Sequence, residues 1–217
     1  MTVPTLVIGN KNYSSWSLRP WLAMSVANIP FTEKLIPLFD ARWDDAIAAL
    51  SPNKKVPLLI DGDLRIWESL AILEYLAEKF PAARLWPENP AARATARAVS
   101  SEMHAGFAAL RAHMPMNIRK TAPDKGRGPG VDDDIARVCA IWRDCRAAFG
   151  ADGPFLFGAF SNADAMFAPI VSRFTTYGVA LDDTCRAYAD TILTLDAMTV
   201  WSDAARTEPW VIDADEV

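Results

Sequence analysis

Cysteine is scarce in this chain of 217 residues, which has three in all and none before Cys139. The N-terminal half therefore contains no Cys-x-x-Cys redox motif and no set of thiolates for a structural zinc site. Cys139, Cys145 and Cys185 are expected to be reduced and to pack as small hydrophobic side chains. A thiol oxidoreductase that uses its own cysteine is disfavoured, because residues 14–17 contain none.

Long apolar runs and an excess of positive charge are also lacking. No stretch of about 18 apolar residues exists, so no transmembrane helix is expected. Residues 1–4 lack the basic and apolar segments of a signal peptide, so a cytoplasmic location is expected. The net charge of −5 argues against a nucleic-acid partner, since such proteins usually carry a basic surface. The hydrophobic share of 51%, with 8 Trp, is enough for a packed core.

The first eighty or so residues alternate short strand and helix patterns. A βαβ unit followed by a ββα unit is predicted, which is the layout of a thioredoxin-like α/β domain with a right-handed crossover. Asp61-Gly62-Asp63 has the turn residues of a β-hairpin. The expected strands cover residues 6–8, 31–37, 57–60 and 64–66, and the expected helices cover 16–28, 42–50 and 69–80.

Three prolines within residues 81–90 then predict a linker between a domain over residues 1–80 and an all-α domain over residues 91–217. Beyond this linker the strand pattern nearly disappears. The expected helices cover residues 91–117, 133–149, 163–177 and 182–198, with loops over 120–134 and 150–160 and a less periodic C-terminal end.

A serine cluster, Ser14-Ser15-Trp16-Ser17, precedes the first helix. Pro20 loses no hydrogen bond in a first helical turn, so Ser17 or a nearby residue is expected to cap the helix. Ser14 and Ser15 would then stay free near the positive end of the helix, where the dipole favours a thiolate by roughly 0.3–1 kcal/mol. Helix capping alone is the simpler alternative.

Two further pairs point to peptide and amino-acid binding. A cis bond at Val56-Pro57 would expose the main chain of Val56 to an extended peptide, and a trans proline at a strand entry is the equal alternative. At Glu68-Ser69, a helix amino end capped by Ser69 would hold a carboxylate, and Glu68 would hold an ammonium group. A capped helix with a solvated glutamate is the alternative there.

In this order and at these distances, the three segments resemble the motifs of cytosolic glutathione transferases, especially the zeta-like and related bacterial serine types. Ser161-Asn162-Ala163-Asp164 is similar to the capping box of the family's helical domain. Ala165 stands where the family usually has a bulkier residue.

The resemblance implies glutathione as co-substrate, with no metal. Ser14, or else Ser15, would lower the pKa of the glutathione thiol and so act catalytically. Lys54 or Lys55 would reach the glycine carboxylate, unless both are solvated. The implied glutathione-binding residues are Lys55, Val56, Pro57, Glu68 and Ser69.

A second substrate is expected between the two domains, next to Trp16, which stands where the zeta pattern usually has cysteine. His104 and Arg111 lie seven residues apart on a predicted helix and would suit an anionic electrophile. Phe107 is the third candidate on this helix. Packing in the core is the alternative for Trp16 and Phe107, and a satisfied surface or interdomain role is the alternative for His104 and Arg111. Arg173 invites comparison with the family's substrate-carboxylate arginine, but its spacing from the preceding proline does not fit that role.

The resemblance therefore predicts a glutathione transferase that acts on a small electrophile in detoxification, as a homodimer in the cytoplasm. Two alternatives remain open: a glutathione-dependent cis–trans isomerase of the maleylacetoacetate type, and a non-catalytic binding protein that keeps the fold. Among reactions, conjugation, isomerisation and peroxide reduction all fit the motifs.

Overall fold

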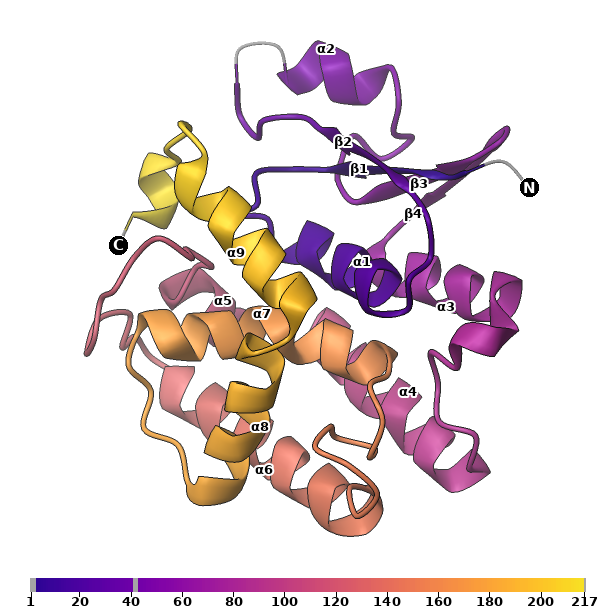
Figure 1. Ribbon diagram of the computed structural model, residues 1–217. Coiled ribbons are helices and arrows are strands. Elements are labelled where there is room, and N and C mark those ends of the chain that lie inside the picture. The colour runs from indigo at the N-terminus through magenta and orange to yellow at the C-terminus, as the bar shows by residue number, and fades with distance from the viewer. Residues whose placement is uncertain (1–2, 41–42, 217) are drawn as a thin grey trace.

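The computed structural model describes residues 3–40 and 43–216. Its N-terminal part is a four-stranded sheet with strand order β2-β1-β3-β4, in which β1 pairs parallel with β2 and antiparallel with β3 (Figure 1). This arrangement confirms the predicted thioredoxin-like domain. The strands are β1 (Thr5–Ile8), β2 (Thr32–Leu35), β3 (Leu58–Asp61) and β4 (Leu64–Trp67).

The two inner strands are buried on both faces. Leu6 and Ile8 contact the main core, whereas Val7 and Leu58 pack in a smaller cluster with Ile47. This alternation follows from the two-residue period of a strand. One face of the sheet is covered by α1 and α3 and the opposite face by α2, as Figure 1 shows. These helices are α1 (Ser15–Val26), α2 (Trp43–Ala48) and α3 (Ser69–Lys79).

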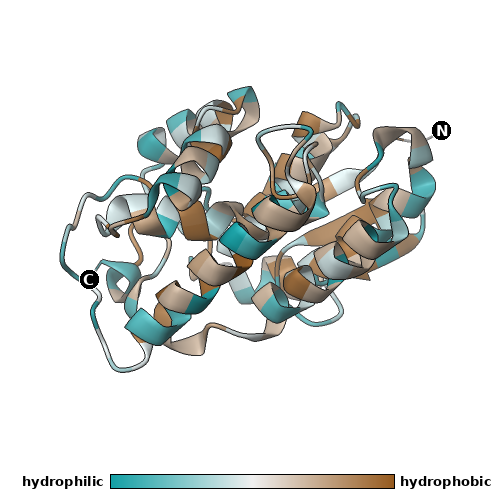
Figure 2. Cartoon of the chain, turned by 90° about the horizontal axis from the view of Figure 1, so that it is seen from below, coloured by the Kyte–Doolittle hydropathy of each residue, from teal (hydrophilic) through white to brown (hydrophobic). Residues whose placement is uncertain are grey.

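The C-terminal region is helical, as predicted. Its central helix, α7, has every residue buried except Thr175, and it packs against α1 and α4. Figure 2 shows apolar stretches on the helices turned toward the interior of this bundle. The helices are α4 (Pro90–Ala105), α5 (Ala108–His113), α6 (Val131–Phe149), α7 (Asn162–Thr176), α8 (Asp183–Leu193) and α9 (Asp196–Thr207).

The predicted capping box at the start of α7 is confirmed. The Asp164 carboxylate accepts the N–H of Ser161 at 2.8 Å and that of Leu156 at 3.1 Å. Asn162 links the same helix start to the rest of the chain, since its main-chain N–H donates to the carbonyl of Leu85 at 2.8 Å and its side chain donates to that of Leu73 at 3.1 Å. Asn162 therefore anchors the start of α7 against α3 and the 81–90 segment.

The prediction of one helix over residues 91–117 was wrong, because α4 and α5 are separate. Gly106 ends α4, and a side chain there would meet the Glu102 carbonyl oxygen at 2.8 Å. Phe107 follows in the left-handed region at φ 60°. The Arg111 guanidinium donates to the carbonyls of Met103, His104 and Gly106, so it satisfies acceptors that the helix end leaves free.

The prediction of one helix over 182–198 was also wrong, since α8 ends before Thr194 and α9 starts at Asp196. The Thr194 hydroxyl donates to the Asp190 carbonyl at 2.9 Å, and Leu195 is extended, with φ −60° and ψ 132°. The expected helix start at 42 involves a residue outside the described part, and α2 is described from Trp43. None of the helices within the described residues is both long enough and apolar enough to cross a membrane.

Candidate functional site

A small cavity of about 150 Å³ lies where the loop before β3 meets the start of α3. The structure thus brings together the five predicted glutathione-binding residues and Trp16 of α1, although they come from three separate segments. Such a volume is below the ~300–1,000 Å³ of sites that enclose a whole drug-sized ligand, so it suits one end of a longer molecule. The lining residues are Trp16, Asn53, Lys55, Val56, Pro57, Glu68 and Ser69.

One wall of the cavity is the main chain before β3. The Val56–Pro57 peptide bond is cis. Within the described residues, no hydrogen bond occupies the N–H or the C=O of Val56. The neighbouring main chain from Leu58 onward is paired on both sides, with β1 and β4. The free pair on Val56 is therefore a place where a peptide can add as an extended strand.

The opposite wall is the start of α3. Glu68 has φ 68° and ψ 123°, a backbone conformation that residues other than glycine rarely adopt. Backbone strain of this kind is typical of functional sites. Ser69 is 1% exposed, and its hydroxyl oxygen has no hydrogen-bond partner in the described structure. The expectation that Ser69 caps α3 was wrong, because Ser69 is the first helical residue and Glu68 holds the cap position.

Asn53 belongs to this site, and sequence reasoning missed it. Its amide oxygen accepts the Ser51 hydroxyl at 2.8 Å and the Lys55 N–H at 3.1 Å. Its amide nitrogen donates to a Glu68 carboxylate oxygen at 3.4 Å. Asn53 thus ties the loop before β3 to Glu68. An asparagine directly after Pro52 is a turn signal that would have identified this loop.

The serine cluster lies at the start of α1 but is arranged differently from the prediction. The helix begins at Ser15, so Ser14 holds the cap position and Pro20 lies inside the helix. Ser17 is not the cap, because its hydroxyl accepts the Gly9 N–H at 3.1 Å and the Ser14 hydroxyl at 2.7 Å. Ser14 and Ser15 are 5% and 6% exposed, and neither is among the residues that line the cavity.

Ser15 has a different partner. Its hydroxyl oxygen accepts a hydrogen bond from the Arg173 guanidinium at 3.4 Å. An oxygen that accepts from arginine keeps its own O–H proton for another acceptor. By these contacts Ser15 has a free proton to donate, whereas the Ser14 hydroxyl donates to Ser17.

Trp16 connects the cavity to the helical region. Its ring centroid lies 5.2 Å from that of His104 and 5.0 Å from the guanidinium carbon of Arg111. His104 Nε2 in turn lies 3.5 Å from the Glu68 carboxylate. His104 and Arg111 therefore do meet at Trp16, although they lie on different helices rather than one.

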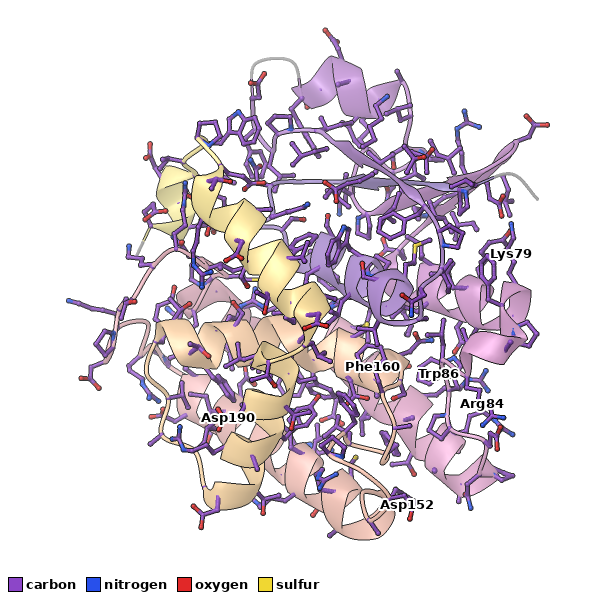
Figure 3. All side chains as sticks on the ribbon, in the orientation of Figure 1. Lys79, Arg84, Trp86, Asp152, Phe160 and Asp190 are labelled. Carbon is purple, nitrogen blue, oxygen red and sulfur yellow. The ribbon has the colours of Figure 1, made fainter. Side chains whose placement is uncertain are left out.

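Phe107, the remaining substrate-binding candidate, is 6% exposed and packs in the main core. The packing alternative holds for this side chain in the described structure. A second cavity of about 450 Å³ lies elsewhere, beside the 81–90 segment. It includes Trp86 and Phe160, which Figure 3 shows near one another, and Arg84. Within the described residues, no group of His, Cys, Asp or Glu side chains is arranged to hold a metal ion.

Comparisons with known proteins agree with this geometry. The model of the glutathione S-transferase N-terminal domain matches residues 13–79. Glutathione S-transferase GstB of Escherichia coli K12 is 25% identical over 177 residues, which cover 80% of this chain and 85% of that protein. A probable maleylacetoacetate isomerase of Caenorhabditis elegans is 34% identical over 108 residues, 49% of each protein. A crystal structure of a glutathione transferase homolog from Burkholderia, with bound glutathione, has a TM-score of 0.72 at 18% identity and covers 95% of this chain and 100% of that one.

Proposed function

We propose that this chain, which belongs to the glutathione S-transferase family, binds glutathione along Val56, Glu68 and Ser69 and activates its thiol for attack on a small electrophile. The observation that carries the proposal is the buried Ser69 hydroxyl, which lines the cavity without a partner. A buried polar group without a partner costs free energy, and a ligand that supplies the missing partner recovers it.

The γ-glutamyl end of glutathione carries an ammonium and a carboxylate group. The Ser69 hydroxyl and the first N–H groups of α3 suit the carboxylate, because a helix amino end attracts anions. The Glu68 carboxylate suits the ammonium group. The free N–H and C=O of Val56 suit the amide of the cysteinyl residue, and exposed Lys55 suits the glycine carboxylate. This order of contacts follows an extended tripeptide across the cavity.

The cysteinyl sulfur would then lie toward the start of α1. A serine hydroxyl that donates to the thiolate, together with the helix dipole, favours ionisation of the thiol at neutral pH. The thiol proton leaves to solvent, the sulfur forms a bond to the electrophilic carbon, and the leaving group departs with its electron pair. Ser15 and Ser14 are the two candidates, and their contacts favour Ser15 as the donor.

The same proposal covers the organisation of the chain. Residues 1–80 bind glutathione, residues 81–90 are the linker, and residues 91–217 bind the second substrate. The protein acts as a homodimer in the cytoplasm and takes part in detoxification. Sedimentation velocity of the full chain tests the dimer, which predicts a mass of twice 23.8 kDa.

Calorimetric titration with glutathione tests the binding site. Ser69→Ala removes one hydrogen bond to a charged group, which is worth about 1.5–3 kcal/mol, so affinity should fall about 10–100-fold. Ser101→Ala, an exposed serine on α4, is the matched control and should bind like the wild type. Glutathione binding that is undetectable in the wild type, or equal in both variants, contradicts the site.

Turnover of 1-chloro-2,4-dinitrobenzene separates the enzyme from a binding protein. We expect Ser15→Ala to lower kcat about 10²-fold or more while glutathione affinity changes little, since the lost hydrogen bond acts on the thiolate. Ser14→Ala is measured alongside. If both variants keep wild-type turnover, the serine mechanism is wrong, and if the wild type binds glutathione but turns over no member of an electrophile panel, the non-catalytic alternative stands.

The isomerase alternative has one supporting observation, the similarity to a protein named as a probable maleylacetoacetate isomerase. Assay of a cis-enone diacid in the presence of catalytic glutathione tests it. Isomerisation leaves the total glutathione unchanged, whereas conjugation consumes one glutathione for each product.

A further inference from the structure

Two buried thiols meet where α6 and α8 pack against each other. Cys139 lies on α6, and Cys185 lies in the first turn of α8. The Cys185 thiol donates to the main-chain carbonyl of Cys139, with 3.6 Å between sulfur and oxygen. Both residues are free thiols, and they are 7% and 0% exposed, respectively. Tertiary packing therefore holds two reduced cysteines together that lie 46 positions apart along the chain.

A surface ion pair joins the same two helix turns. Arg143 follows Cys139 by one turn of α6, and its guanidinium lies 2.6 Å from the Asp182 carboxylate. Asp182 in turn caps α8, because its carboxylate accepts the N–H of Cys185 at 2.9 Å. Both side chains of the ion pair are nearly half exposed. The two thiols therefore lie at the edge of the helical core, beside a charged surface, and not at its centre.

The two thiols differ in how readily they ionise. A hydrogen bond with the Cys185 thiol has the largest effect on Cys139 and lowers its pKa, although burial opposes it. The charges of Asp182 and Arg143 act on Cys139 in opposite directions, and its pKa remains below the ordinary value. The same thiol–thiol contact and burial raise the pKa of Cys185. Since the thiolate is the nucleophile, Cys139 is the sulfur that reacts first with an oxidant.

Cys145 provides a comparison within the same helix. It lies six positions after Cys139 on α6 and is 3% exposed. Burial raises the pKa of its thiol to about 12. Among the described residues, no hydrogen bond joins it to another cysteine. A buried thiol of this kind is inert at neutral pH, so Cys145 packs as a small apolar side chain.

We infer that Cys139 and Cys185 are a redox-sensitive pair, which a hydroperoxide converts to a disulfide that cross-links α8 to α6. The Cys139 thiolate attacks one peroxide oxygen and breaks the O–O bond, which gives a sulfenic acid. The other oxygen takes up the proton that Cys139 lost and leaves as an alcohol, or as water from hydrogen peroxide. The Cys185 sulfur then attacks the sulfenic sulfur and forms the S–S bond, and the sulfenic oxygen leaves as water with the Cys185 proton. Two thiols are thus oxidised while one peroxide is reduced by two electrons.

The disulfide would close a loop that contains the whole of α7. Such a cross-link restricts the unfolded chain, so the oxidised protein should be the more stable form. Within the described residues, neither α6 nor α8 contributes to the cavity lined by Val56 and Ser69, so glutathione should bind equally in both states. The inference is therefore independent of the proposed function.

Oxidation of the folded full chain tests the pair. The reduced protein is treated with hydrogen peroxide at neutral pH, and its free thiols are then counted with a chromogenic disulfide in urea. The count should fall from three to one, and the intact mass should fall by that of two hydrogens. Trypsin cleaves after Arg143, which places Cys139 and Cys145 in different peptides. Mass spectrometry of the unreduced digest should therefore find the Cys139 peptide linked to the Cys185 peptide.

Variants assign the disulfide to the pair. Cys145→Ala is the matched control and should form the same disulfide, whereas Cys139→Ala and Cys185→Ala should form none. If Cys185→Ala does not fold, Cys139→Ala decides. The oxidised wild type should unfold at a higher urea concentration than the reduced wild type, and dithiothreitol should reverse this difference.

Three results would overturn the inference. The first is that all thiols persist in the wild type under conditions that oxidise free glutathione. The second is a disulfide that includes Cys145 or joins two chains, which a non-reducing gel reveals. The third is a disulfide that forms only after urea has unfolded the chain, because the folded packing would then not bring the two sulfurs together.

Discussion

His104 lies between charges of opposite sign at the edge of the site. Its Nε2 is 3.5 Å from a Glu68 carboxylate oxygen, and its ring packs against Trp16. Burial and the charges of Arg19 and Arg111 lower the pKa of the imidazole, and Glu68 opposes them. Their net effect lowers the pKa of His104 from its ordinary value of 6.5, so the imidazole is neutral at pH 7. A neutral imidazole leaves the positive charge of this region to the arginines.

An NMR titration of His104 checks this balance, with His104→Gln to assign its signal. We expect a midpoint below 6.5 in the wild type, a higher one in Arg111→Gln and a still lower one in Glu68→Gln. Because the folded pKa is depressed, His104 contributes stability that is present above about pH 6.5 and is lost as the pH falls through the folded value. A midpoint above 6.5 in the wild type would contradict the assigned charges.

At the residue scale, sequence reasoning found the cavity residues but not the contact between Arg173 and Ser15. Val56, Glu68 and Ser69 lie within one short stretch, so local turn and cap chemistry identifies them. Ser15 and Arg173 are 158 residues apart, and a single sequence carries no signal that joins them. For the same reason the spacing of Arg173 from Pro169 left it without a role, whereas its contact with Ser15 gives it one.

At the element scale, periodicity predicted where helices lie but not where they break. The apolar repeat continues from α4 into α5 and from α8 into α9, so it could not reveal the changes of direction at Gly106 and Leu195. Local backbone conformation decides those breaks. The capping box of α7 was predictable, because both partners lie within one turn of each other.

The capping box of α7 is expected to contribute to the stability of the fold. Ser161→Ala should lower the free energy of unfolding by about 1 kcal/mol, because it removes a capping residue that is 1% exposed. Urea denaturation measures the change. Ser101→Ala, on the exposed surface of α4, should be neutral or slightly stabilising, since alanine is the better helix former. Equal stability of the two variants would contradict a role for the box.

At the scale of the whole molecule, the C-terminal segment holds the loop that precedes α1. Both carboxylate oxygens of Glu208 accept main-chain N–H groups of this loop, from Lys11 at 2.7 Å and from Asn12 at 3.1 Å. Trp201 of α9 donates to the Lys11 carbonyl at 2.9 Å. Figure 1 shows α9 running beside α1. The position of the serine cluster thus depends on residues at the far end of the chain.

Glu208→Ala should therefore lower both stability and turnover. Each of the two partly buried N–H groups left without a partner costs about 1–3 kcal/mol, and the loosened loop misplaces the start of α1. Urea denaturation and hydrogen exchange of the Lys11 and Asn12 amides measure the effect. Glu88→Ala, which removes a glutamate whose side chain is 72% exposed, is the control and should match the wild type. Wild-type protection of the two amides in Glu208→Ala would contradict this coupling.

The bond between Glu208 and Lys11 spans 197 residues, and this has a consequence during translation. At synthesis rates of about 5–20 residues per second, the acceptor emerges roughly 10–40 s after the loop that needs it. A nascent chain whose sheet has folded therefore still lacks the acceptor for the Lys11 and Asn12 N–H groups in the loop before α1. Glutathione binding by ribosome-bound chains stalled at increasing lengths should therefore reach full affinity only once residues near 208 have left the exit tunnel, late in the synthesis of a domain whose own residues emerge first.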